Sequence, residues 1–405
     1  MKVLVINAGS SSCKYQLLDM DTKAPLCSGL VERIGDPTTG NLTHKTFKGG
    51  KEEKTQREHP FPNHVAAMEE VIALLTDAKV GVIKDKGEID AIGHRVVHGG
   101  EEVTAPVLVD EKLKDVIRRC SALSPLHNPA NLMGIEVAEK LFPGTPNVAV
   151  FDTEFGSSMT EEAYMYALPY DCYTELGVRR YGFHGTSHKY IAGETAKFLG
   201  KPLAELDSIT MHLGNGSSMT CVRKGKCVDS SMGLTPLEGL VMGTRCGTID
   251  PSIVPFLMEK KGLSPAQVDA LMNKKSGLLG ICGLTDMRDI HAKIAEGDKK
   301  AALALKLLVR SIRKTLGAYF FLLGGKVDAM VFTAGIGEND NVTRAAVCEG
   351  LDAVGIVLDP AANAVRSSEP RAISAKNSRI PVLVIPTNEE LQIALAAVQV
   401  LGKAS

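Results

Sequence analysis

The sequence predicts an α/β protein built from two similar halves, and three observations support this prediction. Residues 3–19, VLVINAGSSSCKYQLLD, read as an apolar strand, a turn of small residues and a second strand. Residues 209–222, ITMHLGNGSSMTCV, repeat this pattern. In each half, helical periodicity and a buried apolar strand follow the hairpin. The repeated order indicates an internal duplication of α/β character.

The first half is predicted to contain strands and three helices before a domain boundary. We expect strands at 3–6, 15–18, 89–93 and 147–151, a glycine-rich excursion at 38–50, and helices at 64–76, 110–121 and 128–141. Pro129 takes a favoured first-turn position in the third helix. The turn cluster Pro143–Pro146 precedes the last strand, so a boundary is expected near residue 150.

The second half is predicted to repeat the order. We expect hairpin strands from residue 209, helices within 251–272 and 299–323, strands at 329–333 and 382–385, and a helix from 388. The most apolar of these helices, 301–323, is interrupted by basic residues, namely Lys306, Arg310, Arg313 and Lys314. It is therefore expected to be a core helix and not a membrane span.

Composition narrows the class of protein. The 405 residues carry a net charge of −1, which argues against a nucleic-acid or anionic-membrane partner held by bulk electrostatics. The nine cysteines form no CxxC pair, a composition typical of reduced intracellular thiols. A strand begins almost at once, which leaves no room for a signal peptide, so we expect a cytoplasmic protein with no membrane partner.

The two glycine- and serine-rich turns predict phosphate binding. Small residues let backbone N–H groups approach an anion closely, and Lys14 follows the first turn. Either turn alone is more simply explained as an ordinary hairpin. Their duplication favours two halves that share one polyphosphate.

Eight motifs give the chain its resemblance to a known family. They are INAGSSSCKYQL at 6–17, HRVVHGG at 94–100, FDT at 151–153, RRYGFHGTSH at 179–188, HLGNGSS at 212–218, GTRCGTIDP at 243–251, TAGIGEN at 333–339 and TNEE at 387–390. With these motifs in family order, the chain resembles the acetokinase family of the acetate and sugar kinase/actin superfamily.

The resemblance implies a fold and an activity. It implies duplicated ribonuclease-H-like, actin-like ATPase domains facing a central cleft, and a homodimer. Residues 1–150 with 386–405 would form an acyl- and phosphate-binding domain closed by the C-terminal helix, and 151–385 a nucleotide-binding domain. The implied reaction is reversible transfer of the ATP γ-phosphoryl to acetate, which gives acetyl phosphate and ADP, with Mg²⁺ or Mn²⁺ as the metal.

Candidate substrate and catalytic residues follow from the motifs. The planar fork of Arg95 suits a carboxylate, and the matching family arginine binds the substrate. The family's acyl pocket maps onto Val97, Leu126, Phe183 and Pro236. The resemblance assigns catalysis to Asp152, His184 and Arg245. Because a carboxylate substrate is already ionised near neutral pH, we expect Asp152 to orient Mg²⁺, water or an arginine more than to act as a base.

Candidate metal and nucleotide residues complete the set. Asn7 and Glu389 are expected to hold Mg²⁺, since a hard cation prefers oxygen ligands. Thr387 fits an N-cap with Glu390 at N3, a capping box that leaves Glu389 facing the cleft. The remaining candidates are expected to contact ATP or ADP: Ser10, Ser12, Lys14, His212, Leu213, Gly214, Asn215, Gly216, Asp286, Met287, Arg288, Gly335, Ile336, Gly337, Glu338 and Asn339. For Asp286 and Arg288, a surface ion pair is a serious alternative.

One stretch departs from the family pattern. After FDT the family usually continues Ala-Phe-His-Gln-Thr-Met-Pro, whereas residues 154–160 read EFGSSMT.

Two other functions remain open. A propionate kinase shares nearly every motif, although Val97 favours acetate by a modest margin. An actin- or chaperone-like ATPase switch would need a polymer contact or a further domain.

Overall fold

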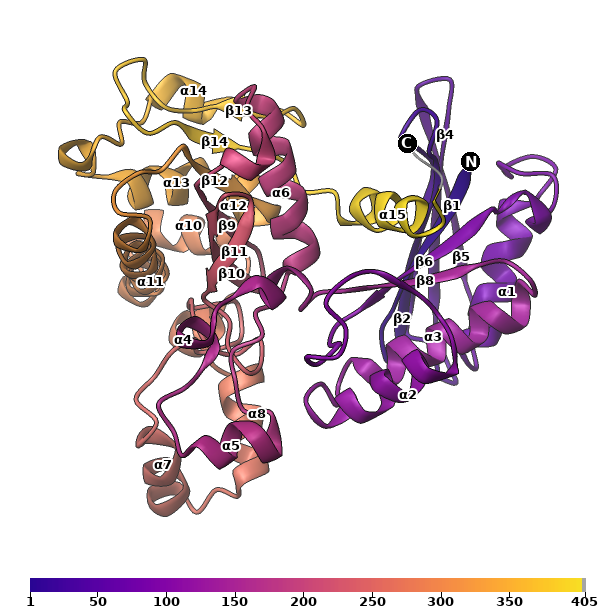
Figure 1. The fold of residues 1–405 in the computed structure, drawn as a ribbon, viewed down its shortest axis with the longest axis horizontal. Coiled ribbons are helices and arrows are strands. Elements are labelled where there is room, and N and C mark those ends of the chain that lie inside the picture. The colour runs from indigo at the N-terminus through magenta and orange to yellow at the C-terminus, as the bar shows by residue number, and fades with distance from the viewer. Residues whose placement is uncertain (403–405) are drawn as a thin grey trace. The chain divides into compact units, whose positions relative to one another are not determined.

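The computed structural model describes residues 1–402 and divides into two compact units. Unit 1 comprises residues 1–154 and 388–405, and unit 2 comprises residues 155–387. The chain therefore passes from unit 1 to unit 2 and back again, as its colour in Figure 1 shows.

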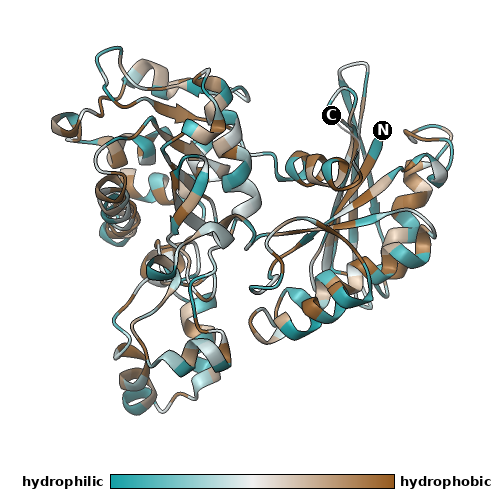
Figure 2. Cartoon of the chain, viewed as in Figure 1, coloured by the Kyte–Doolittle hydropathy of each residue, from teal (hydrophilic) through white to brown (hydrophobic). Residues whose placement is uncertain are grey.

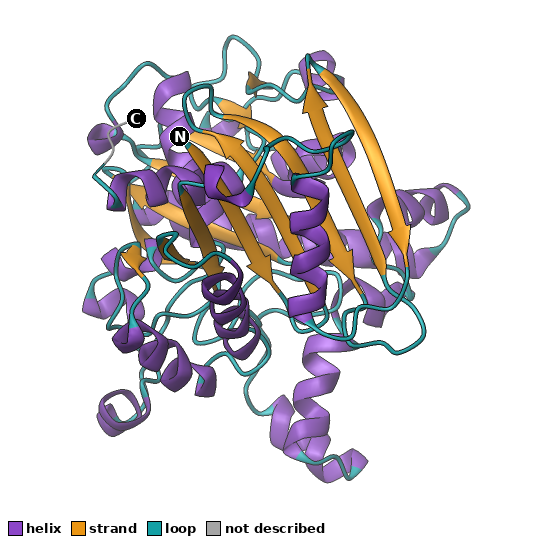
Figure 3. Ribbon diagram, turned by 90° about the vertical axis from the view of Figure 1, so that its right-hand side faces the viewer, coloured by secondary structure: helices purple, strands orange, loops and turns teal. Residues whose placement is uncertain are grey.

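Unit 1 is built on one eight-stranded sheet, whose strands lie side by side in Figure 3. The strands are β1 Lys2–Ala8, β2 Ser12–Asp19, β3 Ala24–Glu32, β4 Asn41–Lys48, β5 Lys51–Glu58, β6 Ala91–Val96, β7 Val107–Leu108 and β8 Asn147–Phe151. The helices are α1 His64–Leu75, α2 Glu111–Arg119, α3 Asn128–Leu141 and α15 Glu389–Val400, with 3-10 turns Lys86–Glu88 and Cys120–Ala122.

Helices cover both faces of this sheet, and this explains the unbroken apolar run in β1. Leu4 and Ile6 face a core shared with α1 and α3, whereas Val3 and Val5 face Ile393 and its neighbours on α15. A strand buried on both faces reads as a continuous apolar run without alternation. The helices α2 and α3 show hydrophilic and hydrophobic bands along their length in Figure 2, as expected for helices with one packed face.

Unit 2 is built on a six-stranded sheet. Its strands are β9 Ser208–Leu213, β10 Ser217–Arg223, β11 Lys226–Ser230, β12 Ala329–Thr333, β13 Arg371–Ala372 and β14 Val382–Val384. Its helices are α4 Glu161–Tyr164, α5 Tyr170–Leu176, α6 Gly185–Phe198, α7 Ile253–Lys261, α8 Pro265–Lys274, α9 Gly277–Cys282, α10 Met287–Ala295, α11 Lys299–Leu322, α12 Ala334–Asn339, α13 Asn341–Cys348 and α14 Pro360–Ala364, with 3-10 turns Phe155–Ser158, Leu203–Glu205 and Asp352–Val354.

The two sheets share one topology. Unit 1 contains the strand order β3-β2-β1-β6-β8, and unit 2 contains β11-β10-β9-β12-β14. In both, the first three strands pair antiparallel and the next two are added in parallel. The predicted α/β class and the internal duplication are therefore confirmed.

The predicted glycine-rich excursion over 38–50 is wrong. Residues 41–48 form β4, which pairs antiparallel with β5 through a turn at Gly49 and Gly50. In β4 the buried face carries Leu42, His44 and Thr46, so polar residues conceal the alternation. The edge strand β5, KEEKTQRE, is mostly exposed, and charged residues on an edge discourage pairing with other chains.

No helix within residues 1–402 is both long enough and apolar enough to cross a membrane. The longest, α11, buries one stripe that includes Leu308, Ile312 and Leu316 against the sheet of unit 2.

Candidate active site

In unit 1, Arg95 stands near the end of β6 and contacts two other predicted residues, Asp152 and Asn7. Its Nε donates to Asp152 Oδ1 at 3.2 Å, and its Nη2 pairs with Asp152 Oδ2. Its Nη1 lies 3.4 Å from Asn7 Oδ1. Asp152 is only 2% exposed at the end of β8. The parallel pairing of β1, β6 and β8 brings the carboxyl ends of all three strands to one edge of the sheet.

Acidic residues around Arg95 stabilise its charge. Burial opposes that charge, but Asp152, Glu389 and Glu390 outweigh burial, so the pKa of Arg95 is raised. At Glu389, by contrast, the surroundings disfavour the charged form. Burial, together with Asp152 and Glu390, raises the pKa of Glu389 from 4.5 to about 7, although Arg95 and Lys14 act to lower it. With a pKa of about 7, Glu389 is present in both its protonated and its ionised form near neutral pH.

The oxygen atoms of Asn7 and Glu389 fit the requirements of a magnesium site. Mg²⁺ takes one or two carboxylates and keeps several waters, so it needs no large protein cage. Within residues 1–402 no group of three or more His, Cys, Asp or Glu side chains has the geometry of a metal site. A site here would thus rest on few protein ligands, with a carboxylate whose ionisation a cation would favour.

The predicted capping box at Thr387 is wrong. Asn388 caps α15, and its Oδ1 accepts the N–H of Leu391 at 3.0 Å. Glu390 instead pairs with Lys14, which projects from β2. Thr387 belongs to unit 2, where its N–H donates to Glu338 Oε1 at 3.0 Å. The residue types did not distinguish Thr387 from Asn388, because threonine and asparagine are both favoured at the N-cap.

The remaining unit 1 candidates lie around the β1–β2 turn and after β6. Gly9 closes the turn by donating its N–H to Ser12 O at 2.8 Å, while Ser10 is exposed. Val97 is buried, and its N–H is held by Asn131 Oδ1 at 3.0 Å. Leu126 is 64% exposed, so within unit 1 it does not line a closed apolar wall.

In unit 2, His184 immediately precedes α6 with a left-handed backbone, at φ 57°. A non-glycine residue rarely adopts this conformation, and such strain is concentrated at functional sites. His184 Nδ1 lies 2.8 Å from Ser218 Oγ, and its ring stacks on His212 at 4.2 Å between centroids. His212 Nδ1 in turn lies 2.9 Å from Ser187 Oγ.

Arg245 reaches the same place from the loop after β11. A Cβ added to Gly216 would lie 3.4 Å from His184 Nε2 and 3.5 Å from Arg245 Nη1. The two candidates therefore converge on the glycine turn of residues 214–216. Arg245 Nη1 donates to Pro236 O at 3.0 Å, and burial lowers the pKa of Arg245. Among residues 1–402 no carboxylate forms an ion pair with Arg245, which leaves a partly buried positive charge for an anion.

A cavity of about 690 Å³ in unit 2 is lined by eight of the thirteen nucleotide candidates that belong to this unit. Its lining includes Gly214, Asn215, Asp286, Met287, Arg288, Gly335, Ile336 and Asn339. It also includes residues that the sequence did not predict, namely Thr285, His291, Asp340, Asn341, Val342 and Arg366. Asp340 directly follows the TAGIGEN motif and could have been suspected, whereas nothing in the sequence links Arg366 to this wall.

Five nucleotide candidates of unit 2 lie outside that lining: His212 and Gly216, which lie beside His184, and Leu213, Gly337 and Glu338. Leu213 is fully buried in the core of unit 2, and Gly337 packs against the backbone of Phe332. Glu338 turns back and accepts N–H groups of Ala334 and Thr387. Asp286 and Arg288 do form the ion pair that was the alternative, at 2.6 Å, but both also line the cavity.

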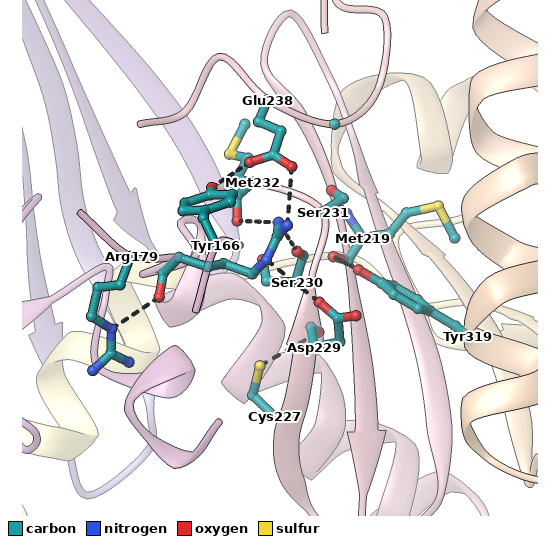
Figure 4. Close-up of polar contacts among 12 residues, drawn as sticks. Tyr166, Arg179, Met219, Cys227, Asp229, Ser230, Ser231, Met232, Glu238 and Tyr319 are labelled. Atoms are coloured by element: carbon teal, nitrogen blue, oxygen red, sulfur yellow. Dashed lines mark hydrogen bonds and ion pairs between the residues drawn. The ribbon is translucent and has the colours of Figure 1, made fainter. Parts of the chain in front are cut away.

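The second arginine of the RRYGFHGTSH motif anchors the loop that carries Pro236, a contact that the sequence did not predict. Arg180 donates to Ser230 O at 2.7 Å and to Glu238 Oε1 at 3.0 Å. Tyr166 Oη also donates to Glu238 (Figure 4). Because Pro236 O holds the guanidinium of Arg245, this network fixes the loop from which Arg245 is oriented.

The atypical stretch 154–160 has a local structural reason. Gly156 stands where the family pattern has histidine, and a Cβ there would lie 2.0 Å from Tyr181 O. The backbone of this chain thus packs too closely against Tyr181 to accept any side chain at this position. Ser158 Oγ ties the stretch to Cys227 O at 2.8 Å.

Comparison with known proteins places these residues in a family. The family model described as the acetokinase family matches residues 2–395. The acetate kinase of Desulfovibrio desulfuricans is 72% identical over 404 residues, which is 100% of each chain. The crystal structure of Porphyromonas gingivalis acetate kinase matches with a TM-score of 0.93 at 45% identity over 99% of each chain. A propionate kinase from Francisella tularensis matches with a TM-score of 0.91 at 40% identity, over 98% of this chain and 99% of that one. The chain belongs to the acetokinase family, as its motifs predicted.

Proposed function

We propose that this protein is an acetate kinase that transfers the γ-phosphoryl group of ATP directly and reversibly to acetate. The carboxylate oxygen of acetate attacks phosphorus, the bond from phosphorus to the β–γ bridging oxygen breaks, and ADP leaves with that electron pair. The names of the relatives support this activity. The observation that carries the proposal in the structure is Arg245, a partly buried cation beside His184 with no carboxylate partner among residues 1–402.

The nucleotide is assigned to unit 2. A cavity of about 690 Å³ has the size of a small-molecule site, and two glycine-rich segments of its wall permit close approach of phosphates. His184 and Arg245 meet at one of these segments, the turn of residues 214–216. Positive charge at that point would stabilise the charge on the transferring phosphoryl group.

Acetate is assigned to Arg95, with Val97, Leu126, Phe183 and Pro236 as candidates for the acyl pocket. The guanidinium of Arg95 has two edges that each present a pair of N–H groups, and Asp152 already accepts from the edge formed by Nε and Nη2. We therefore infer that Asp152 orients Arg95. No general base is required, because acetate reaches the site as a carboxylate.

Magnesium is assigned to Asn7 and Glu389, whose oxygen atoms lie beside Arg95. When bound, the cation would neutralise phosphate charge. A homodimer in the cytoplasm, with unit 1 binding the acyl group and unit 2 the nucleotide, completes the proposal.

A propionate kinase is the second candidate. The similarity to the Francisella tularensis propionate kinase at 40% identity supports it, since one methylene in an apolar pocket changes affinity by only about 1–3 kcal/mol. An ATPase switch without an acyl substrate ranks lower, because it gives no role to the Arg95 and Asp152 pair.

A hydroxylamine-trapping assay distinguishes these functions. The purified protein is incubated with ATP, Mg²⁺ and formate, acetate, propionate or butyrate, and acyl hydroxamate is measured. We expect the highest kcat/KM with acetate and no product without ATP. A preference for propionate would identify the second candidate, and ATP hydrolysis without hydroxamate would identify the ATPase.

A further inference from the structure

Behind His184 runs a chain of hydrogen bonds that connects it to the interior of unit 2. His184 Nδ1 lies 2.8 Å from Ser218 Oγ, and Ser218 Oγ lies 2.7 Å from His188 Nε2. His188 Nδ1 lies 2.7 Å from Thr210 Oγ1, whose hydroxyl donates to Thr220 O at 3.4 Å. These residues come from α6, β9 and β10, and Thr210, His188 and Ser218 are all fully buried.

The number of hydrogens that each group carries determines which group donates in each hydrogen bond of this chain. Burial, followed by the neighbouring His212, holds the pKa of His188 well below 6.5, so its ring is neutral and has one N–H. Because Thr210 uses its hydrogen on Thr220 O, it can only accept from His188, which puts the His188 proton on Nδ1. The Nε2 atom of His188 is then an acceptor, and the Ser218 hydroxyl must donate to it.

The same reasoning identifies the donor in the hydrogen bond between Ser218 and His184. Once Ser218 has donated its hydrogen to His188, its oxygen can only accept from His184 Nδ1. The reverse direction would also satisfy both histidines, but Thr210 would then give up its bond to Thr220 O. The observed contacts therefore favour a His184 ring that carries a proton on Nδ1.

We propose that Thr210, His188 and Ser218 form a relay that fixes the proton of His184 on Nδ1, and that all three are positioning residues for His184. A ring protonated on Nδ1 can donate from Nε2 only as an imidazolium. The relay thus selects the cationic form of His184 for contact with the transferring phosphoryl group. This last step rests on the proposed function, whereas the proton position does not.

The direct test is ¹⁵N NMR of the intact protein labelled at histidine. The spectrum of His184→Gln is used only to assign the His184 signals. In the neutral form of the ring, we expect a pyrrole-type Nδ1 signal with a bonded proton and a pyridine-type Nε2 signal. A neutral ring protonated on Nε2 would overturn the relay, and this measurement needs neither a further variant nor activity.

A substitution distant from His184 tests the relay as a unit. Thr210→Val removes the acceptor of the His188 proton, so His188 and Ser218 reverse and the His184 proton moves to Nε2. Thr195→Val is the matched control, because Thr195 is equally buried in α6 but donates only to Ile191 O in its own helix. An unchanged His184 tautomer in Thr210→Val, or the same change in Thr195→Val, would contradict the proposal.

Kinetics provide the second measurement. Removing the partner that orients a metal-ligating histidine typically lowers activity by about 10–100-fold, and we expect an effect of similar size at His184. We expect Thr210→Val to lower kcat by roughly that factor with little change in either KM, and Thr195→Val to leave kcat intact. A loss confined to KM would contradict a role in positioning His184. If wild-type protein forms no acyl phosphate, the proposed function fails, while the tautomer measurement still decides the relay.

Discussion

At the residue scale, the contact between Arg95 and Asp152 uses two nitrogens and two oxygens. Lysine at position 95 would keep the charge but lose this planar fork. We expect Arg95→Lys to raise the KM for acetate by roughly tenfold, about 1.4 kcal/mol, with little change for ATP. Steady-state kinetics with each substrate varied separately measure both values. Arg119→Lys is a matched control, since Arg119 also contacts both carboxylate oxygens of an acidic residue, Glu102, but on the surface. Equal KM values for acetate in wild type and Arg95→Lys would remove Arg95 from the substrate site.

For Arg245 we expect an effect on kcat more than on KM, because no carboxylate among residues 1–402 pairs with it and its charge is available to the transferring phosphoryl group. Removing one preorganised electrostatic contact to a transition state costs about 10²–10³ in kcat. We expect a loss of this size in Arg245→Ala, with smaller changes in KM, measured by the same assay. Arg223→Ala removes an exposed arginine that donates to Leu322 O and should retain full activity. If only the KM values change, Arg245 binds the ground state instead.

The raised pKa of Glu389 predicts how stability depends on pH. Its carboxyl group binds a proton more tightly in the folded protein, so its unfavourable contribution is absent below 4.5 and complete above about 7. Glu389→Gln should therefore raise the free energy of unfolding at pH 8 by on the order of 1–2 kcal/mol, and very little at pH 4.5. Urea titrations without metal at both pH values measure this difference. The same variant should need more Mg²⁺ for activity. A stability gain that is equal at both pH values would contradict the assignment.

At the element scale, the start of α15 is set by Asn388. Replacing a good N-cap with alanine costs about 0.5–2 kcal/mol. We expect this loss of unfolding free energy in Asn388→Ala, measured by urea denaturation. Glu390→Ala is the control for the cap: it removes the pair with the half-exposed Lys14, and such pairs contribute about 0–1 kcal/mol. It also removes a negative charge near Arg95 and Glu389 but leaves the Asn388 cap in place. A larger loss in Glu390→Ala would restore the capping box at Thr387.

Elements whose local signals agree could be predicted from the sequence, and elements that depend on distant partners could not. Helix α3 and strands β8 and β12 have the predicted bounds, because an apolar pattern, a turn cluster or a helix-start proline marks each one. The hairpin of β4 and β5 has no such pattern, since its burial comes from the sheet beside it. The same distinction applies to the candidate site. Residues within the motifs could be predicted and lie together in each unit, whereas His291 and Arg366 lie outside the motifs and line the cavity from other parts of the chain.

At the scale of the whole molecule, two compact units with separate cores predict two unfolding transitions. Ile393 belongs to the core beneath α15 in unit 1, and Ile312 belongs to the core beneath α11 in unit 2. Burial of both side chains is nearly complete, so each Ile→Ala change should cost about 2–5 kcal/mol. In differential scanning calorimetry, Ile393→Ala should lower one transition and Ile312→Ala the other. A single transition lowered equally by both variants would show that the units unfold together.

The double passage of the chain between units also affects biosynthesis. On the ribosome, β1, β6 and β8 are made early, but the helix that covers Val3 and Val5 is made only after residues 155–387. At about 5–20 residues per second, that interval is on the order of tens of seconds. During this time one apolar face of the nascent sheet lacks its cover, while unit 2 is a continuous segment that can complete its fold first. The nascent chain should therefore depend on holding chaperones until α15 emerges.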